Sequence, residues 1–210
     1  MFELANASVF LDFDGTITMR DIGVHLLERL GAPEWRVISA QYARGEIGSR
    51  ECSIAEWALI RSDEATLRAV AREVPIDPGF ESLVAELRAA DAEVTVVSDG
   101  FGFYVESVCS PLDLPALTNS VDFGTGELVF PHEDRGCPCS TCGVCKQAPI
   151  KDAQHRGRDT VLVGDGISDR KAAFLADVVF AKGSLATWCA ANGVPYVPFT
   201  TLDDVRYALI

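Results

Sequence analysis

The chain has 210 residues, 48% of them hydrophobic, which suffices for the core of one domain, or of one domain with a modest insertion, and excludes wholesale disorder. Its 18 basic and 31 acidic residues give a formal charge of −13, so we expect neither nucleic acid nor anionic membrane surfaces as partners. The sequence carries no basic secretion signal and no apolar run of membrane-spanning length, so we expect a cytoplasmic protein. We expect it to be a monomer or a homodimer.

The first predicted element is a buried strand over residues 7–12, a short apolar run that ends in the polar turn Asp14-Gly15-Thr16. Residues 20–74 carry apolar side chains at helical spacing and predict a wholly helical segment. After this segment helices and strands alternate, which indicates a parallel sheet covered by helices on both faces. We predict strands over residues 93–97, 160–163 and 178–181, and helices over residues 80–90, 101–109, 168–176 and 184–192.

Residues 116–145 interrupt this alternation. Residues 121–129 predict a small β-hairpin, and a cysteine-rich loop follows it. The predicted fold class is therefore α/β: a doubly wound, Rossmann-like parallel sheet with a helical cap inserted after the first strand, and a small β-hairpin with a Cys-rich loop. We assign residues 1–18 and 76–210 to the core, and residues 19–75 to the helical cap.

Polar clusters follow three of the predicted strands, at residues 12–16, 98–100 and 164–169. In an open parallel sheet, ligands bind beyond the carboxyl ends of the strands, so we expect these clusters to meet in one crevice. Carboxylates brought together in this way repel one another, and a divalent cation relieves the repulsion. The sequence therefore predicts an oxygen-rich Mg²⁺ site.

The carboxylates divide into two groups. Asp12 and Asp14 can share one pocket if the chain turns at Gly15, and one of them can then attack phosphorus while the other donates and accepts protons. Asp165 is placed to complete the Mg²⁺ site. Asp169 can orient Asp165, a metal-bound water or a lysine from behind the site.

A transferring phosphoryl group also needs hydrogen-bond donors and positive charge. Ser98 offers a hydroxyl group, and Gly100 lets its backbone N–H approach closely. Lys146 and Lys151 are the candidates for the positive charge. We favour Lys146, because it precedes a helical pattern, and anions are stabilised at the start of a helix.

The order of these groups resembles a known set of motifs. The run Asp-Phe-Asp-Gly-Thr-Ile-Thr at residues 12–18, Ser98, Lys146 and Gly-Asp-Gly-x-x-Asp at residues 164–169 resemble the four motifs of the haloacid dehalogenase-like superfamily. The helical insertion resembles the cap of its phosphoserine phosphatase-like branch. Within that branch, three short segments resemble the methionine-salvage phosphatases of 2-hydroxy-3-keto-5-methylthiopentenyl-1-phosphate: residues 33–35, 142–146 and 177–181.

The resemblance implies a role for each matching residue. Asp12 would be the nucleophile and Asp14 the general acid and base. Asp12, the Asp14 carbonyl and Asp165 would hold Mg²⁺, and Ser98 and Lys146 would bind the phosphoryl group. Asp14 also implies a phosphatase rather than a dehalogenase, because hydrolysis of an acyl phosphate needs this second acid.

Two further acids bear on the substrate. Asp99, which we count with Ser98, Gly100 and Lys146 among the candidate phosphate-binding residues, stands where members of the family commonly carry glycine. This extra acid borders the pocket, so the substrate of relatives cannot simply be copied. Asp21 lies nine residues after Asp12, where phosphoserine phosphatases carry an acid that binds the polar end of the substrate. It can do the same here, or it can cap a helix that begins at Ile22.

Four cysteines fall within nine residues, at Cys137, Cys139, Cys142 and Cys145. Four thiolates can hold a structural Zn²⁺ ion, although one short segment makes a tight site. The alternatives are reduced cysteines or a reversible disulfide. The total of seven cysteines is odd, which argues against a fully disulfide-paired secreted protein.

Together these features predict a Mg²⁺-dependent phosphomonoesterase that hydrolyses a small phosphorylated metabolite through an aspartyl phosphate. The candidate substrates are the methionine-salvage enol phosphate, phosphoserine and other small alcohol phosphates. A phosphomutase, a non-enzymatic phospho-acceptor of the receiver-domain kind and a metal-binding module built on the cysteines are the alternatives.

Overall fold

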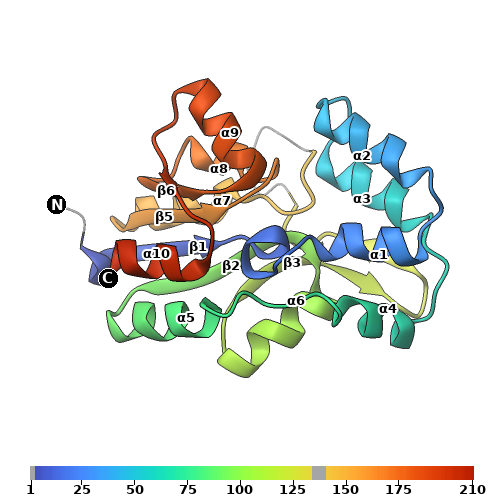
Figure 1. Ribbon diagram of the computed structural model, residues 1–210, viewed down its shortest axis with the longest axis horizontal. Helices are drawn as coiled ribbons and strands as arrows, with labels where there is room; N and C mark the ends of the chain where they lie inside the picture. Colours follow the sequence, from blue (N-terminus) through green and yellow to red (C-terminus); the bar gives the residue numbers. More distant parts are fainter. Residues whose placement is uncertain (1–2, 134–140) are drawn as a thin grey trace.

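The computed structural model describes residues 3–133 and 141–210. Within them lies a seven-stranded sheet of order β4-β3-β2-β1-β5-β6-β7 (Figure 1). Neighbouring strands are parallel except for the antiparallel pair β3 and β4. The strands are β1 (Ala7–Leu11), β2 (Glu93–Phe101), β3 (Ala116–Asp122), β4 (Glu127–Val129), β5 (Asp159–Gly164), β6 (Val178–Ala181) and β7 (Val197–Pro198).

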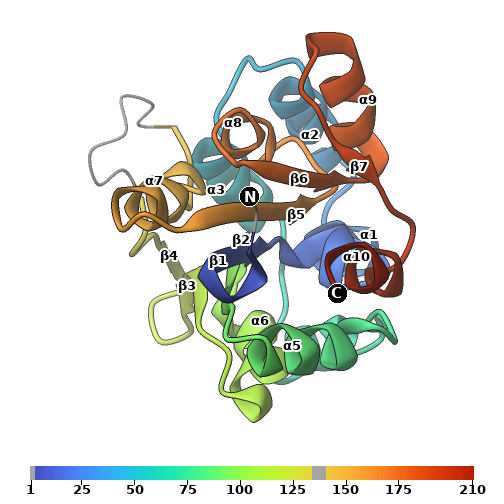
Figure 2. The ribbon, with the colours of Figure 1, turned by 90° about the vertical axis from the view of Figure 1, so that its left-hand side faces the viewer.

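Helices cover both faces of this sheet, as Figure 2 shows along its edge. One face carries α5 (Phe80–Ala89), α6 (Gly102–Cys109) and α10 (Leu202–Leu209). The other carries α7 (Gln147–His155), α8 (Arg170–Ala173) and α9 (Gly183–Asn192). The predicted doubly wound α/β fold is therefore confirmed.

The central strand β1 is buried along its whole length and is apolar at every position except Ser8. Val9 and Leu11 belong to the hydrophobic core that includes α5 and α10, whereas Phe10 belongs to the core beneath α7 to α9. Successive strand residues point to opposite faces, and here both faces are covered, so alternation between polar and apolar side chains is absent from this strand. The strand ends at Leu11, and the buried carboxylate of Asp12 follows it directly.

Four helices follow β1, namely α1 (Ile22–Leu30), α2 (Trp35–Ala43), α3 (Ser49–Trp57) and α4 (Glu64–Ala71). They lie beyond the carboxyl ends of the central strands, on the right in Figure 1. The chain enters and leaves this helical segment at one place, because Thr18 pairs with Ile76 in an antiparallel bridge and Met19 N–H donates to the Pro75 carbonyl at 2.9 Å. These contacts lie at the predicted limits of the cap, residues 19–75.

Several element boundaries differ from prediction, and two of these differences have an identifiable physical cause. Strand β2 does not stop at residue 97 but continues through the polar residues to Phe101, which pairs with Asn119 of β3 after an irregularity in the register. Helix α8 begins at Arg170 rather than at residue 168, because the Asp169 side chain accepts from backbone N–H groups in the preceding turn. The predicted hairpin is present as β3 and β4, with Val121 opposite Leu128.

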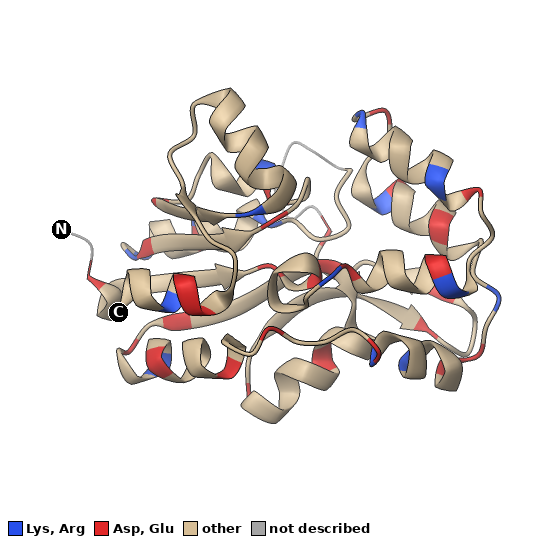
Figure 3. Cartoon of the chain, in the orientation of Figure 1, with Lys and Arg blue, Asp and Glu red and all other residues tan. Residues whose placement is uncertain are grey.

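Acidic residues occur on the cap helices and on the core helices alike (Figure 3). None of the helices in residues 3–133 and 141–210 combines the length and the apolar character that crossing a membrane requires.

Candidate active site

The carboxyl ends of β1, β2 and β5 bring the three polar clusters together, as their adjacent places in the sheet require. Asp12 directly follows β1, and its N–H donates to the Val163 carbonyl of the neighbouring β5 at 2.9 Å. Asp165 directly follows β5, and Ser98 lies near the end of β2. Residues distant in sequence thus become neighbours at one edge of the sheet.

The turn after Asp12 depends on Gly15. Its φ of +80° lies in the left-handed region, and a Cβ atom there would be 2.5 Å from an Asp165 carboxylate oxygen. The turn also places Thr16 between the two acids, with its hydroxyl 3.5 Å from Asp12 Oδ2 and 3.2 Å from Asp165 Oδ1. Thr16 belongs to the motif at residues 12–18, but no local pattern indicates this position between two carboxylates.

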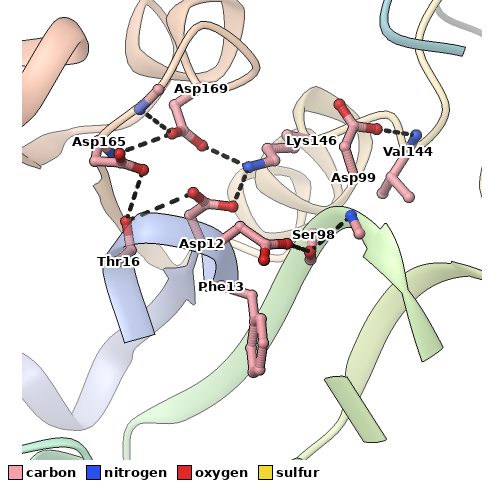
Figure 4. A network of polar contacts seen from close by, with 12 residues as sticks. Asp12, Phe13, Thr16, Ser98, Asp99, Val144, Lys146, Asp165 and Asp169 are labelled. Atoms are coloured by element: carbon pink, nitrogen blue, oxygen red, sulfur yellow. Dashed lines mark hydrogen bonds and ion pairs between the residues drawn. The ribbon is translucent and has the colours of Figure 1, made fainter. Parts of the chain in front are cut away.

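Lys146 is the buried cation of the site. Figure 4 shows its amine between two carboxylates, with Nζ 2.5 Å from Asp12 Oδ1 and 2.7 Å from Asp169 Oδ1. Lys146 directly precedes α7, and 5% of its surface is exposed. Lys151 lies one turn further along α7 and is partly exposed. The structure therefore brings Lys146, and not Lys151, to the acids.

Asp169 anchors both the lysine and the loop after β5. Its Oδ1 contacts Lys146, while its Oδ2 accepts from the N–H groups of Asp165 at 3.2 Å and Gly166 at 3.0 Å. The side chain is fully buried. Both of the protein partners that the sequence proposed for Asp169, Asp165 and Lys146, are thus in contact with it.

The site carries more negative charge than one lysine neutralises. Burial raises the pKa of Asp12 to about 7, and nearby Asp165 adds to the rise although the Lys146 ammonium opposes it. Burial and Asp12 likewise raise the pKa of Asp169 to about 6. Burial alone would lower the pKa of Lys146, but the carboxylates of Asp12 and Asp169 raise it above its ordinary value. These carboxylates would be stabilised by a further positive charge.

The acids also have the geometry of a cation site. Asp12, Asp165 and Asp169 each offer a ligand atom, and these atoms lie within 4.8 Å of one another. Mg²⁺ prefers oxygen ligands of this kind and keeps several waters. The residues present therefore fit the predicted ion, and Asp169 lies close enough to belong to the same group of oxygens.

Asp14 occupies the other side of the pocket. Its Oδ1 accepts from the N–H of Ile22 at 2.9 Å, and its Oδ2 accepts from the hydroxyl of Tyr104 at 3.2 Å and that of Ser98 at 3.4 Å. Burial and the nearby Asp21 raise the pKa of Asp14 well above its ordinary value. Tyr104 was not predicted, because an aromatic residue in a helical pattern gives no sign that its hydroxyl reaches an acid.

Ser98 and Gly100 face Asp14 from β2. Gly100 N–H donates to Ser98 Oγ at 2.9 Å, which orients the hydroxyl at the floor of the pocket. A Cβ atom at Gly100 would lie 2.3 Å from the Tyr104 hydroxyl and 2.5 Å from Asp14 Oδ2, so only glycine fits there. The predicted phosphate-binding pair is thus in place beside the predicted general acid.

Asp99, the departure from the family pattern, turns toward the loop before Lys146. Its Oδ1 accepts from the N–H of Val144 at 2.7 Å, and its carbonyl accepts from the Asn119 side chain at 2.7 Å. The adjacent Gly143 N–H donates to the hydroxyl of Ser49 on α3 at 3.1 Å. Asp99 therefore connects β2 to the segment that carries the lysine.

A cavity of about 400 Å³ opens between the strand ends and helices α1 to α3. Asp12, Asp14 and Asp165 line its floor, and Asp21 lines its cap side. Asp21 Oδ1 also accepts from the N–H of Val24 at 2.8 Å, so it caps α1. Asp21 therefore has one of its two predicted roles, that of helix cap, and its place in the cavity wall leaves the other, contact with the polar end of a substrate, a prediction.

The cysteine cluster is only partly described. Cys137 and Cys139 lie outside the described residues. Cys142 Sγ lies 3.8 Å from Lys171 Nζ, and Cys145 is buried. Among the described residues, the group suited to a metal is the acidic one, so nothing supports the zinc hypothesis.

Comparison with known proteins agrees with this geometry. Residues 9–173 match the family model of haloacid dehalogenase-like hydrolases. The chain belongs to the haloacid dehalogenase-like hydrolase family. Its predicted membership is confirmed, and the chain is a phosphoric monoester hydrolase of this family.

Curated relatives of this haloacid dehalogenase-like chain include 2-hydroxy-3-keto-5-methylthiopentenyl-1-phosphate phosphatases. The protein from Brevibacillus brevis is 30% identical over 205 residues, which cover 94% of this chain and 92% of the relative. The one from Bacillus cereus is 31% identical over 214 residues, which cover 96% of this chain and 94% of the relative.

Solved structures of similar fold include phosphoserine phosphatases. One, with an analogue of the phospho-aspartyl intermediate, has a TM-score of 0.73 at 18% identity and covers 100% of both chains. The enzyme from T. onnurineus has a TM-score of 0.74 at 20% identity and covers 99% of this chain and 96% of its own. At 18% and 20% identity, this similarity shows that the chains share the haloacid dehalogenase-like fold.

Proposed function

We propose that the protein is a Mg²⁺-dependent phosphatase of a small metabolite that works through a phosphorylated Asp12. The observation that carries the proposal is the position of the buried Lys146 amine between Asp12 and Asp169, with Asp165 and Asp14 at the same cavity. A carboxylate nucleophile, a second acid and a fixed cation are the groups that phosphoryl transfer through an acyl phosphate requires.

In the first step, a carboxylate oxygen of Asp12 attacks phosphorus and the bond from phosphorus to the leaving-group oxygen breaks. Asp14 gives its proton to that oxygen. Lys146 and Ser98 bind the equatorial oxygens of the transferring group. Asp12, Asp165 and the Asp14 carbonyl would hold Mg²⁺, which supplies positive charge to the phosphoryl oxygens.

In the second step, a water oxygen attacks phosphorus and Asp14 takes a proton from that water. The bond between phosphorus and Asp12 breaks, so that phosphate leaves and the Asp12 carboxylate is restored. Asp14 thus serves as acid and then as base. Its contacts with Tyr104 and Ser98 support both roles, because they orient the carboxyl group.

For the substrate, we infer the compound named in the relatives, 2-hydroxy-3-keto-5-methylthiopentenyl-1-phosphate. The upper part of the cavity supports this inference, because Leu27, Trp57, Ile60 and Phe101 give it an apolar wall that suits a methylthio end. Phosphoserine is the second candidate, on the basis of the phosphoserine phosphatases that share the fold.

Phosphate release from a panel of small phosphomonoesters tests the proposal, with these two compounds in the panel. We expect release that requires Mg²⁺ and that falls to background in Asp12→Asn. Asp152→Asn is the matched control, since Asp152 is exposed on α7. Turnover retained by Asp12→Asn would contradict the covalent mechanism, and a phosphorylated product without free phosphate would indicate a phosphomutase. A phosphoenzyme that persists without turnover would indicate a phospho-acceptor protein.

A further inference from the structure

The cap side of the cavity contains a carboxylate that the chemistry above does not use. Glu56, near the end of α3, lines the cavity together with Ser39 of α2. The hydroxyl of Ser39 donates to Glu56 Oε1, and the thiol of Cys52 one turn earlier donates to the same carboxylate. These two contacts hold the Glu56 side chain in a defined place on the wall.

This carboxylate can accept more than these two donors. An ionised carboxylate has about four lone-pair sites, so a hydroxyl group of a ligand in the cavity can share it. Burial raises the pKa of Glu56, and nearby Asp21 adds to the rise. A donor from a ligand would lower the free energy of the ionised carboxylate in this partly buried place, whereas a second carboxylate would raise it.

An apolar surface continues from this position. The Trp57 and Phe101 rings pack with centroids 5.3 Å apart, and the Trp57 indole N–H donates to the Gly126 carbonyl at 3.0 Å. Because that bond occupies the indole N–H, Trp57 contributes an apolar surface to the wall. Leu27 and Ile60 extend it. A ligand that contacts Glu56 therefore meets an apolar wall beside it.

We propose that Glu56 is a specificity-determining residue, which accepts a hydrogen bond from a hydroxyl group of the leaving group and repels leaving groups that carry a carboxylate. The proposal rests on the proposed function, since it concerns the substrate of the same site. It assigns the protein to phosphate esters whose leaving group is uncharged, hydroxylated and apolar at its far end. The compound named in the relatives has this chemistry, whereas phosphoserine does not.

A matched pair of substrates tests the role of Glu56. Glycerol 3-phosphate and 3-phosphoglycerate differ by a hydroxymethyl group in place of a carboxylate. We expect the wild-type protein to have the higher kcat/KM for glycerol 3-phosphate. In Glu56→Gln, which keeps the size but removes the charge, the ratio of the two kcat/KM values should fall roughly tenfold, because the repulsion between like charges is lost.

Glu34→Gln is the control, since Glu34 is exposed at the start of α2, and it should keep the wild-type ratio. An unchanged ratio in folded Glu56→Gln overturns the proposal. So does a wild-type preference for 3-phosphoglycerate, a measurement that needs no variant. Absence of phosphate release from every ester by the wild-type protein would instead contradict the proposed function itself.

Discussion

The side chain on which most of the site depends is Lys146. It is buried, and its amine touches two buried carboxylates, Asp12 and Asp169. Such an arrangement adds little net stability compared with apolar side chains, but removal of one partner leaves charge buried without compensation. The lysine therefore couples the stability of the fold to the chemistry of the site.

We predict that Lys146→Met lowers the free energy of unfolding by about 3–5 kcal/mol and abolishes phosphate release, because Asp12 and Asp169 lose their common counter-ion. Urea denaturation measures the first effect. Lys151→Met is the control, because Lys151 is partly exposed on the same helix, and its effect should stay within about 0.5 kcal/mol. Equal losses of unfolding free energy in the two variants would show that the buried ion pairs of Lys146 contribute no more to stability than a partly exposed lysine does.

Asp99 acts on the site through the loop before Lys146. We predict that Asp99→Ala, which removes the acceptor for Val144 N–H, lowers kcat roughly 10- to 100-fold, because misplacement of a catalytic group by about 1 Å costs that much. Asp99→Asn keeps an oxygen at this position and should recover most of the rate. Steady-state kinetics on both variants tests this. If Asp99→Asn lowered kcat as much as Asp99→Ala, the rate would depend on the charge of Asp99 and not on its hydrogen bond.

Sequence reasoning reached some residues of the site and missed others for a physical reason. Asp12, Asp14 and Asp165 could be found because they stand at the ends of apolar runs, where a parallel sheet places its ligands. Tyr104 and Glu56 could not, since each belongs to a helix whose rotation about its axis is set by packing against distant elements. No local pattern reveals which of their atoms face the cavity.

At the scale of elements, strands and helices were likewise predicted where the sequence signal is local, and their ends were missed where contacts with other elements decide them. The hairpin and the core strands β1, β2, β5 and β6 were predicted because apolar runs and turns are local signals. The extension of β2 to Phe101 was missed because pairing with β3 keeps polar residues in extended conformation. The late start of α8 was missed because the side chain of Asp169 is already engaged with the preceding loop.

Helix α10 offers a prediction about pH. Asp204 accepts from the N–H groups of Thr200 and Thr201, both at 2.9 Å, in a capping box that begins the helix. These bonds lower the pKa of Asp204 below its ordinary 3.8. In the folded state Asp204 therefore binds a proton less readily than it does in the unfolded chain. The ionised Asp204 side chain stabilises the fold at pH values above 3.8, and this stabilisation is lost as pH falls through the lowered pKa.

We expect Asp204→Asn to unfold at a lower temperature than the wild-type protein at neutral pH, with a difference that shrinks as pH falls below 3.8, the ordinary pKa of aspartate. Thermal melts followed by circular dichroism over a series of pH values measure it. Asp113→Asn should show no such trend, since Asp113 lies in a surface turn between α6 and β3. A difference that grows toward acid would reverse the sign and contradict the argument.

At the scale of the whole molecule, the cap and the core are joined at both ends of α3. Arg50 N–H donates to the Thr141 carbonyl at 3.2 Å near the start of the helix, and the Trp57 indole donates to Gly126 of the hairpin near its end. We propose that residues 19–75 act as a cap that closes over the site and excludes bulk water. The contact with Thr141 lies in the same loop that leads to Lys146.

The acidic group predicts how the molecule as a whole responds to Mg²⁺. An ion that binds only the folded state stabilises it by RT ln(1 + [L]/Kd), or about 2.7 kcal/mol at a hundredfold excess over Kd. For a chain of this size that corresponds to a rise in Tm of roughly 5–10 °C. We predict such a rise for the wild-type protein in MgCl₂ relative to NaCl of equal ionic strength.

The rise should disappear in Asp165→Asn, which removes the charge of one oxygen ligand, and it should persist in Asp159→Asn at the other end of β5. This comparison separates a bound ion from general screening of the formal charge of −13, because screening would stabilise both variants alike. Equal rises in the two variants would therefore place Mg²⁺ away from Asp165. A rise confined to wild-type and Asp159→Asn protein would tie the ion to the acids that surround Lys146.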